Sequence, residues 1–300
     1  MPKKSQSKSH YLLLKQKWLK RHKLASKNLQ QKHKEAFDWI VEKFPAKEQL
    51  ASSLIGAVML SSVIPTSTVL AALSDKSSPT SEVTTVDKTG EMLGELKSVI
   101  GDSMRPLTRD EEVTTSQILS KYFGMRVNFE INGLRLNRSY GVIGAEQHLA
   151  RFPGDNMATH LDMGSAEGKM FYASGMAPGR GAWGYFAESK AEFGEPALER
   201  EKWYIAVQTF EAPNYNGRLA EYRDFFKYRK MLVVNPQSGH AVVCDIADSG
   251  PAIWTGKHLG GSPEVMYFLG LGEKVRQGPV LYFFIDDPDN KVALGPVRAQ

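Results

Sequence analysis

Alternating or continuous runs of apolar residues predict a series of short strands in the C-terminal two thirds of the chain. Residues 125–131 alternate apolar and polar side chains, and the turn dipeptide Asn132-Gly133 separates them from a second short run. From residue 166 onward, similar runs lie at 170–173, 203–210, 231–235, 241–246 and 280–285. Their lengths and their β-branched or aromatic content are typical of strands, so the sequence predicts a mainly β fold in this part.

Helix boundaries are also readable along the chain. Thr108 followed by Glu111 forms a capping box ahead of an apolar stripe, and Gly124 is placed to end that helix. Further short helices are expected around 91–100 and 219–228, and after Ser262, a good N-cap residue. The chain then divides into a basic helical segment (1–48), an apolar segment (49–74), a flexible linker (75–104), a small α+β module (105–165) and a β domain (166–300).

The segment 49–74 has 26 residues and no charged side chain. A bilayer core needs about 20 apolar residues, so this segment predicts a transmembrane or signal helix. Lys and Arg crowd its N-terminal side, which predicts a single-pass protein of the cell membrane with an extracytoplasmic C-terminal body. Two alternatives stay open: cleavage of a signal peptide near Val69-Leu-Ala71, giving a secreted protein, and a buried core helix.

The basic character of the chain is confined to its N-terminal part. Residues 1–48 hold 13 Lys/Arg and 4 Asp/Glu, a net of +9, so the other 252 residues carry −4 within the total of +5. Residues 8–44 can form a basic helix on an anionic inner leaflet or a solvated tail. Binding of nucleic acid by this arm is a weaker interpretation, and we expect no nucleic-acid partner.

Asp248 is the best single candidate for chemistry. The runs 231–235 and 241–246 read as two paired strands, and Asp248 follows them beside Gly250-Pro251. A carboxylate at such a corner can be presented into a groove. The alternative is that Asp248 accepts backbone hydrogen bonds and only fixes the turn.

This region resembles a known family. The matching residues are Val233-Val-Asn-Pro-Gln-Ser-Gly239, Ala241-Val-Val243, Asp248-Ser-Gly-Pro251, Gly256-Lys257 and Ser262. They are similar to the double-psi β-barrel domain of rare lipoprotein A-like lytic transglycosylases and, more distantly, of expansins. The resemblance covers roughly 230–272, is faint over 166–229 and does not extend to 1–165. It implies a six-stranded double-psi β-barrel over 166–300, a wall polysaccharide such as peptidoglycan as partner, and Asp248 as catalytic acid.

Two positions depart from the family pattern. A second acid precedes the helix that follows the Gly-Lys pair in the family, and this chain has Gly260 there. The family also carries a histidine on an early strand, and the best equivalent here is Gln208. Both departures favour a module that binds glycan without cleaving it.

Other residues suit a saccharide site. Trp183, Tyr185 and Trp254 offer flat apolar faces with a polar edge, and with Gln208 and Lys257 they are the expected substrate-binding residues. For each aromatic residue, core packing is the alternative.

The sequence predicts neither a metal site nor a cofactor. His148, His160 and Asp162 are its only hints of metal ligands, and their spacing matches no signature. The single cysteine, Cys244, lies in an apolar run and is expected to be a buried small hydrophobe.

The leading hypothesis is a membrane-tethered, extracytoplasmic wall protein that binds peptidoglycan strands and cleaves them as a lytic transglycosylase. A lytic enzyme can work with one acid, because the sugar's own C6 hydroxyl replaces water as the nucleophile. The alternatives are a non-catalytic glycan-binding or scaffolding module, and a domain that contacts other proteins through the aromatic insertion at 211–230.

Overall fold

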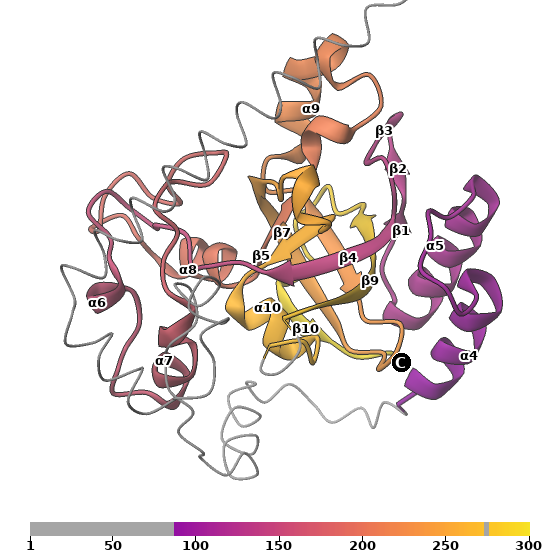
Figure 1. Cartoon of the computed structure of the whole chain (residues 1–300), viewed down its shortest axis with the longest axis horizontal. Coiled ribbons are helices and arrows are strands. Elements are labelled where there is room, and N and C mark those ends of the chain that lie inside the picture. The colour runs from indigo at the N-terminus through magenta and orange to yellow at the C-terminus, as the bar shows by residue number, and fades with distance from the viewer. Residues whose placement is uncertain (1–86, 273–275) are drawn as a thin grey trace, which may run out of the picture. The chain divides into compact units, whose positions relative to one another are not determined.

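The computed structural model describes residues 87–272 and 276–300 (Figure 1). The basic segment 1–48, the apolar segment 49–74 and the first part of the expected linker lie outside these residues. Within the ranges described, none of the helices has the length and apolar character needed to span a bilayer. The transmembrane and signal predictions therefore stay predictions.

Six strands form a closed, mixed β-barrel. They are β4 (Tyr140–Ala145), β5 (Tyr204–Val207), β6 (Lys230–Val234), β7 (Ala241–Ser249), β8 (Leu259–Gly261) and β9 (Gln277–Ile285). Their order around the barrel is β9, β4, β8, β5, β7, β6 and back to β9. The pairs β4/β8 and β5/β7 are parallel and the other four are antiparallel. The prediction of a mainly β barrel preceded by helices is confirmed at this level.

Four further strands lie outside the ring. The strand β1 (Val127–Asn128) pairs with β9, and β10 (Gly295–Val297) pairs with β7. The strands β2 (Glu130–Ile131) and β3 (Leu134–Arg135) form a small hairpin. The turn between them is the predicted Asn132-Gly133, and both residues adopt positive φ.

Alternation along the strands places most of the buried apolar side chains in two large clusters, and a third, smaller one contains Leu149, Tyr204 and Ala247. Val233, Cys244 and Phe284 belong to a cluster to which all six barrel strands contribute, which places it inside the barrel. Cys244 has no exposed surface there, as its sequence setting predicts. The neighbouring residues Leu232 and Phe283 face the other way, into a second cluster.

Two helices cover this second cluster. They are α4 (Thr89–Ile100) and α5 (Arg109–Phe123), which pack Met92, Leu96 and Leu119 against the barrel wall. In Figure 1 they lie on one side of the barrel, and α6 (Met157–His160) and α7 (Ala166–Phe171) lie on the other. The remaining helices are α8 (Glu195–Lys202), α9 (Leu219–Phe226) and α10 (Pro263–Phe268), and short 3-10 turns include η2 (Tyr172–Ser174) and η5 (Ile253–Thr255).

Several local predictions are confirmed. Thr108 Oγ1 accepts the Glu111 N–H and Glu111 Oε2 accepts the Thr108 N–H, which completes the capping box of α5. Gly124 ends that helix in the left-handed conformation. Ser262 caps α10 by accepting the Val265 N–H.

Two segments differ from the sequence interpretation. The expected strand at 170–173 is the end of α7 and the start of η2, because Ser165 caps a helix there and only Phe171 of the run is buried. Residues 140–145, grouped by sequence with the module at 105–165, form barrel strand β4. Its partners lie in β8 and β9, more than a hundred residues later, so the local pattern gave no indication of them.

We predict that Thr108→Ala lowers the free energy of unfolding by about 1 kcal/mol, because the first turn of α5 loses its side-chain acceptor. The matched control is Thr114→Ala in the same helix, whose hydroxyl is exposed and bonds only to the Asp110 carbonyl. Urea denaturation of both variants measures the difference. Equal stability of the two variants would contradict the role given to the cap.

Candidate functional site

The barrel presents Asp248 near the end of β7 through a shift in strand register. Ile205 of β5 pairs with Ile246, but Ala206 pairs with Asp248, so Ala247 is an extra residue on β7. A bulge of this kind bends the strand and redirects the side chains that follow it. Asp248 is half-buried, and Ser249 beyond it is exposed.

A glycine-rich loop, residues 175–184, holds the Asp248 carboxylate through a backbone hydrogen bond. Oδ1 accepts the N–H of Ala182 and that of Ser249, each at 2.8 Å. The loop comes this close because Gly181 has no side chain: a Cβ there would lie 2.7 Å from the Ala247 carbonyl oxygen. The backbone of the loop therefore lies directly against β7, and the loop fixes the orientation of the acid.

The environment favours the protonated form of Asp248. Burial raises the pKa of its carboxyl above the ordinary value and outweighs the two backbone hydrogen bonds, which lower it. The negative charge of Glu146 raises the pKa further. A carboxyl group with a raised pKa is suited to donate a proton.

Asp248 lies in a cleft of about 320 Å³, which falls within the range of small-ligand sites. Ser249 and Thr255 are exposed at its rim, so the cleft opens to solvent. Its lining comprises Glu146, Ala206, Asp248, Ser249, Gly250, Pro251, Ala252, Thr255 and Lys257.

Two residues that line the cleft, Glu146 and Lys257, form an ion pair that the sequence did not reveal. Glu146, directly after β4, places Oε1 3.1 Å from Lys257 Nζ. The two glycines beneath the pair, Gly144 and Gly260, are partners in the parallel β4/β8 ladder. A Cβ on Gly260 would lie 2.3 Å from Glu146 Cγ, and one on Gly144 would lie 2.1 Å from Lys257 Cδ. Glu146 therefore lies over Gly260, the position at which the family resemblance expects a second acid.

Only some of the expected substrate-binding residues lie at the cleft. Lys257 lines the cleft, and Trp254 stands beside it on η5 with 90% of its surface exposed. Gln208 is buried, and its Nε2 donates to the carbonyl oxygens of Pro251 and Lys257, so it ties two parts of the cleft wall together.

Trp183 and Tyr185 do not line the cleft. The indole N–H of Trp183 donates to the Ile246 carbonyl, and its ring packs against the barrel core. The ring of Tyr185 lies under the Arg180 guanidinium, 5.5 Å from its centroid. Trp183 and Tyr185 therefore help to fix the loop that holds Asp248.

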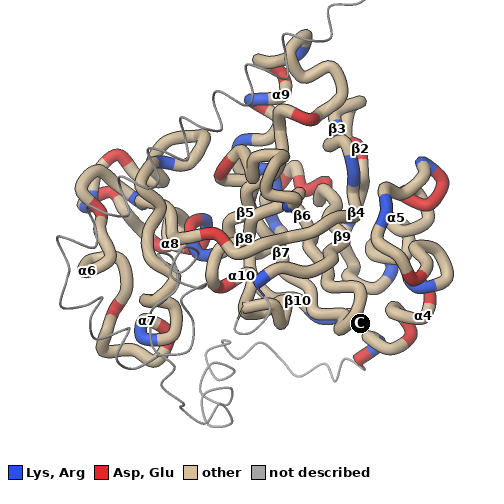
Figure 2. Tube along the Cα trace, viewed as in Figure 1, with Lys and Arg blue, Asp and Glu red and all other residues tan. Residues whose placement is uncertain are grey.

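Metal-ligating residue types meet at a different place. His148 and His160 lie together with Glu201 in the interior, whereas Asp162 is exposed and accepts the Gly164 N–H in a turn. Elsewhere in the described ranges, acidic and basic residues are interspersed along the trace (Figure 2).

We predict that Gly260→Ala destabilises the protein by about 1–3 kcal/mol, because the new methyl group collides with Glu146. The atoms that collide are Cγ and those beyond it in Glu146, which alanine lacks. Adding Glu146→Ala to Gly260→Ala should therefore restore most of the lost stability. Denaturation of both single variants and the double variant gives the coupling energy, with Gly179→Ala, which has open space, as control. Additive effects would show that Glu146 does not lie over Gly260.

We also predict that the Asp248 carboxyl titrates at higher pH in the folded chain than in the urea-unfolded chain. Glu146→Gln should lower the folded-state midpoint, because it removes the negative charge that acts on Asp248. Carboxyl-carbon NMR with a selective Asp label measures both. A folded midpoint at or below the unfolded one would refute the burial argument.

Comparisons of the sequence with known proteins assign the chain to no family. The sequence matches no protein-family model, and no curated protein matches it at a significant level.

Proposed function

We propose that the barrel binds a glycan strand of the bacterial cell wall along the Asp248 cleft and cleaves it as a lytic transglycosylase. The observation that carries the proposal is a half-buried aspartate with a raised pKa that lines an open cleft, with one oxygen held by two backbone N–H groups. The residue match to double-psi β-barrels of the rare lipoprotein A type supports the choice of substrate.

The reaction needs one acid that later becomes a base. Asp248 gives its proton to the glycosidic oxygen, and the bond from that oxygen to the anomeric carbon breaks. The C6 hydroxyl of the same sugar attacks the anomeric carbon and forms a 1,6-anhydro ring, while the Asp248 carboxylate takes the hydroxyl proton. Oδ1 is held by Ala182 and Ser249, so the carboxyl keeps a fixed orientation through both steps.

Trp254 and Lys257 extend the site. An exposed indole beside the cleft gives a sugar ring a flat apolar surface. Lys257 can bond to hydroxyl or carboxylate groups of the glycan, with its position fixed by Glu146.

Glu146, as a second acid in the cleft, makes hydrolysis an alternative to lytic cleavage. Hydrolysis of glycosides usually uses two carboxylates, and Glu146 brings a second one to the cleft. Its ion pair with Lys257 favours a positioning role, so we assign the cleavage to Asp248 alone. Hydrolysis would leave reducing ends on the fragments, and lytic cleavage would leave anhydro ends.

The alternative is a non-catalytic glycan-binding or scaffolding module. It is favoured by Gly260 at the usual acid position and by Gln208, whose amide N–H groups are used to hold the cleft wall. In either case the proposed location is the outer side of the cell membrane, with residues 49–74 as the tether or cleaved leader.

We predict that the full-length chain releases 1,6-anhydromuropeptides from purified peptidoglycan, and that Asp248→Asn lowers the rate by roughly 10²–10⁴ because the general acid is lost. Mass spectrometry identifies the ends of the fragments. Asp224→Asn, an exposed aspartate on α9, is the matched control and should leave the rate unchanged.

Each other outcome excludes part of the proposal. Equal rates for wild type and Asp248→Asn would remove Asp248 from the chemistry. Co-sedimentation with peptidoglycan without product would favour the binding module. No binding and no product would favour a domain that contacts proteins through 211–230.

A further inference from the structure

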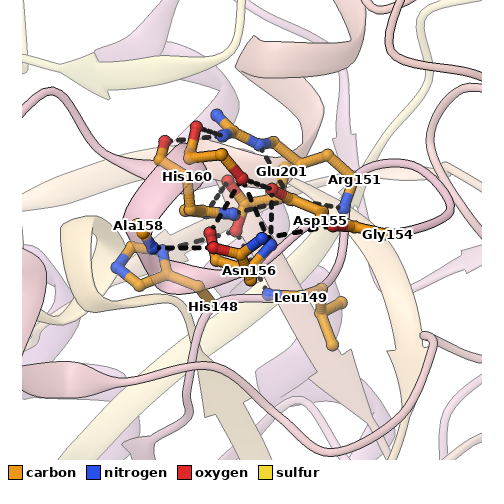
Figure 3. A network of polar contacts seen from close by, with 10 residues as sticks. His148, Leu149, Arg151, Gly154, Asp155, Asn156, Ala158, His160 and Glu201 are labelled. Atoms are coloured by element: carbon orange, nitrogen blue, oxygen red, sulfur yellow. Dashed lines mark hydrogen bonds and ion pairs between the residues drawn. The ribbon is translucent and has the colours of Figure 1, made fainter.

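The insertion at 146–203, between β4 and β5 in the chain, holds a compact buried group of metal-binding side chains. His148 follows β4, His160 ends α6 and Glu201 lies in α8, so three separate segments converge (Figure 3). One ligand-type atom from each lies within 4.8 Å of the other two. The three residues are 0%, 4% and 2% exposed, which excludes an ordinary solvated charge cluster.

The distances suit coordination of one ion. His160 Nε2 lies 3.1 Å from Glu201 Oε2, and His148 Nδ1 lies 3.4 Å from Glu201 Oε1. Ligand atoms at about 2.0–2.1 Å from a tetrahedral metal are separated by about 3.3 Å. Each imidazole therefore lies at about this separation from one oxygen of the Glu201 carboxylate, His160 from Oε2 and His148 from Oε1.

His160 is oriented as a metal-ligating histidine would be. Its Nδ1 lies 2.8 Å from Asp155 Oδ2, and the same oxygen accepts the backbone N–H and the Nε–H of Arg151. Asp155 thus holds the proton on Nδ1 and directs the Nε2 lone pair toward the Glu201 carboxylate. Two electron-rich atoms facing each other need a positive species between them, either a proton or a metal ion.

His148 supplies the independent observation. Neither of its ring nitrogens makes a hydrogen bond of good geometry, although the ring is fully buried and Nδ1 lies 3.4 Å from Glu201 Oε1. A buried polar group without a partner costs roughly 1–3 kcal/mol, so such a nitrogen calls for a ligand. A proton shared between His160 and Glu201 would leave both nitrogens of His148 without a partner, whereas a metal ion would bind one of them together with His160 and Glu201.

We propose that His148, His160 and Glu201 bind one divalent transition-metal ion, with zinc as the best fit to two imidazoles and a carboxylate. None of the three lines the Asp248 cleft, and all are buried, so the ion has a structural role.

The ion would join the two ends of the insertion, next to β4 and β5, to α6 in its middle. The insertion contains little regular structure, yet it carries the loop that grips Asp248. The metal proposal does not depend on the glycan proposal, because its readouts are metal content and thermal stability.

The test uses the full-length chain, stripped with a chelator and titrated with Zn²⁺. We expect about one tightly bound ion per chain and a thermal midpoint raised by roughly 5–10 °C at a hundredfold excess over Kd. The double variant His148→Ala/His160→Ala should lose this binding. Asp155→Asn, which removes the carboxylate that orients His160 and leaves all three ligands in place, should weaken it by roughly 10–100-fold. The control is His240→Ala, an exposed histidine, which should bind as wild type does.

Two results overturn the proposal: a folded wild type that binds neither Zn²⁺, Co²⁺, Mn²⁺, Fe²⁺, Ni²⁺ nor Cu²⁺, and a folded double variant that retains the ion. If the double variant does not fold, zinc X-ray absorption of the wild type decides. A first shell of nitrogen and oxygen with two imidazoles supports the site, and a shell with sulfur or with fewer imidazoles contradicts it.

Discussion

The arrangement of this protein depends on β6 using both of its edges. It exchanges hydrogen bonds with β7 on one side and β9 on the other, and this closes the sheet into a ring. Closure separates the alternating side chains into an interior and a wall, and it leaves the wall to be covered by α4 and α5. It also brings β4 against β8, which is how Glu146 and Lys257 meet over two paired glycines.

Features encoded within a few residues could be predicted from the sequence. The capping box of α5, the β6–β7 pair, the Ser262 cap and the burial of Cys244 each depend on near neighbours in the chain. The strand expected at 170–173 was wrong for a related reason: a run of four apolar residues does not distinguish a strand from the end of a short helix.

The rest depends on pairings across long stretches of sequence. Glu146 could not be recognised as a cleft residue, because its place follows from β4 lying beside β8. The cluster of His148, His160 and Glu201 is likewise assembled from three segments, and the sequence hint included Asp162 in place of Glu201. Asp248 could be predicted because a turn and a family-like pattern surround it in the sequence. Its hydrogen bond from the Ala182 N–H joins residues 66 positions apart and could not be predicted.

The position of β9 in the chain has a consequence for how the molecule is made. β9 is the last barrel strand in chain order, and it pairs with β1, β4 and β6. Until it emerges from the ribosome, the two strands that flank it in the ring have open edges and the apolar interior is incomplete. Contacts between such distant residues form slowly, because a long loop must close first. The nascent chain therefore passes through an aggregation-exposed stage that ends only when this strand docks.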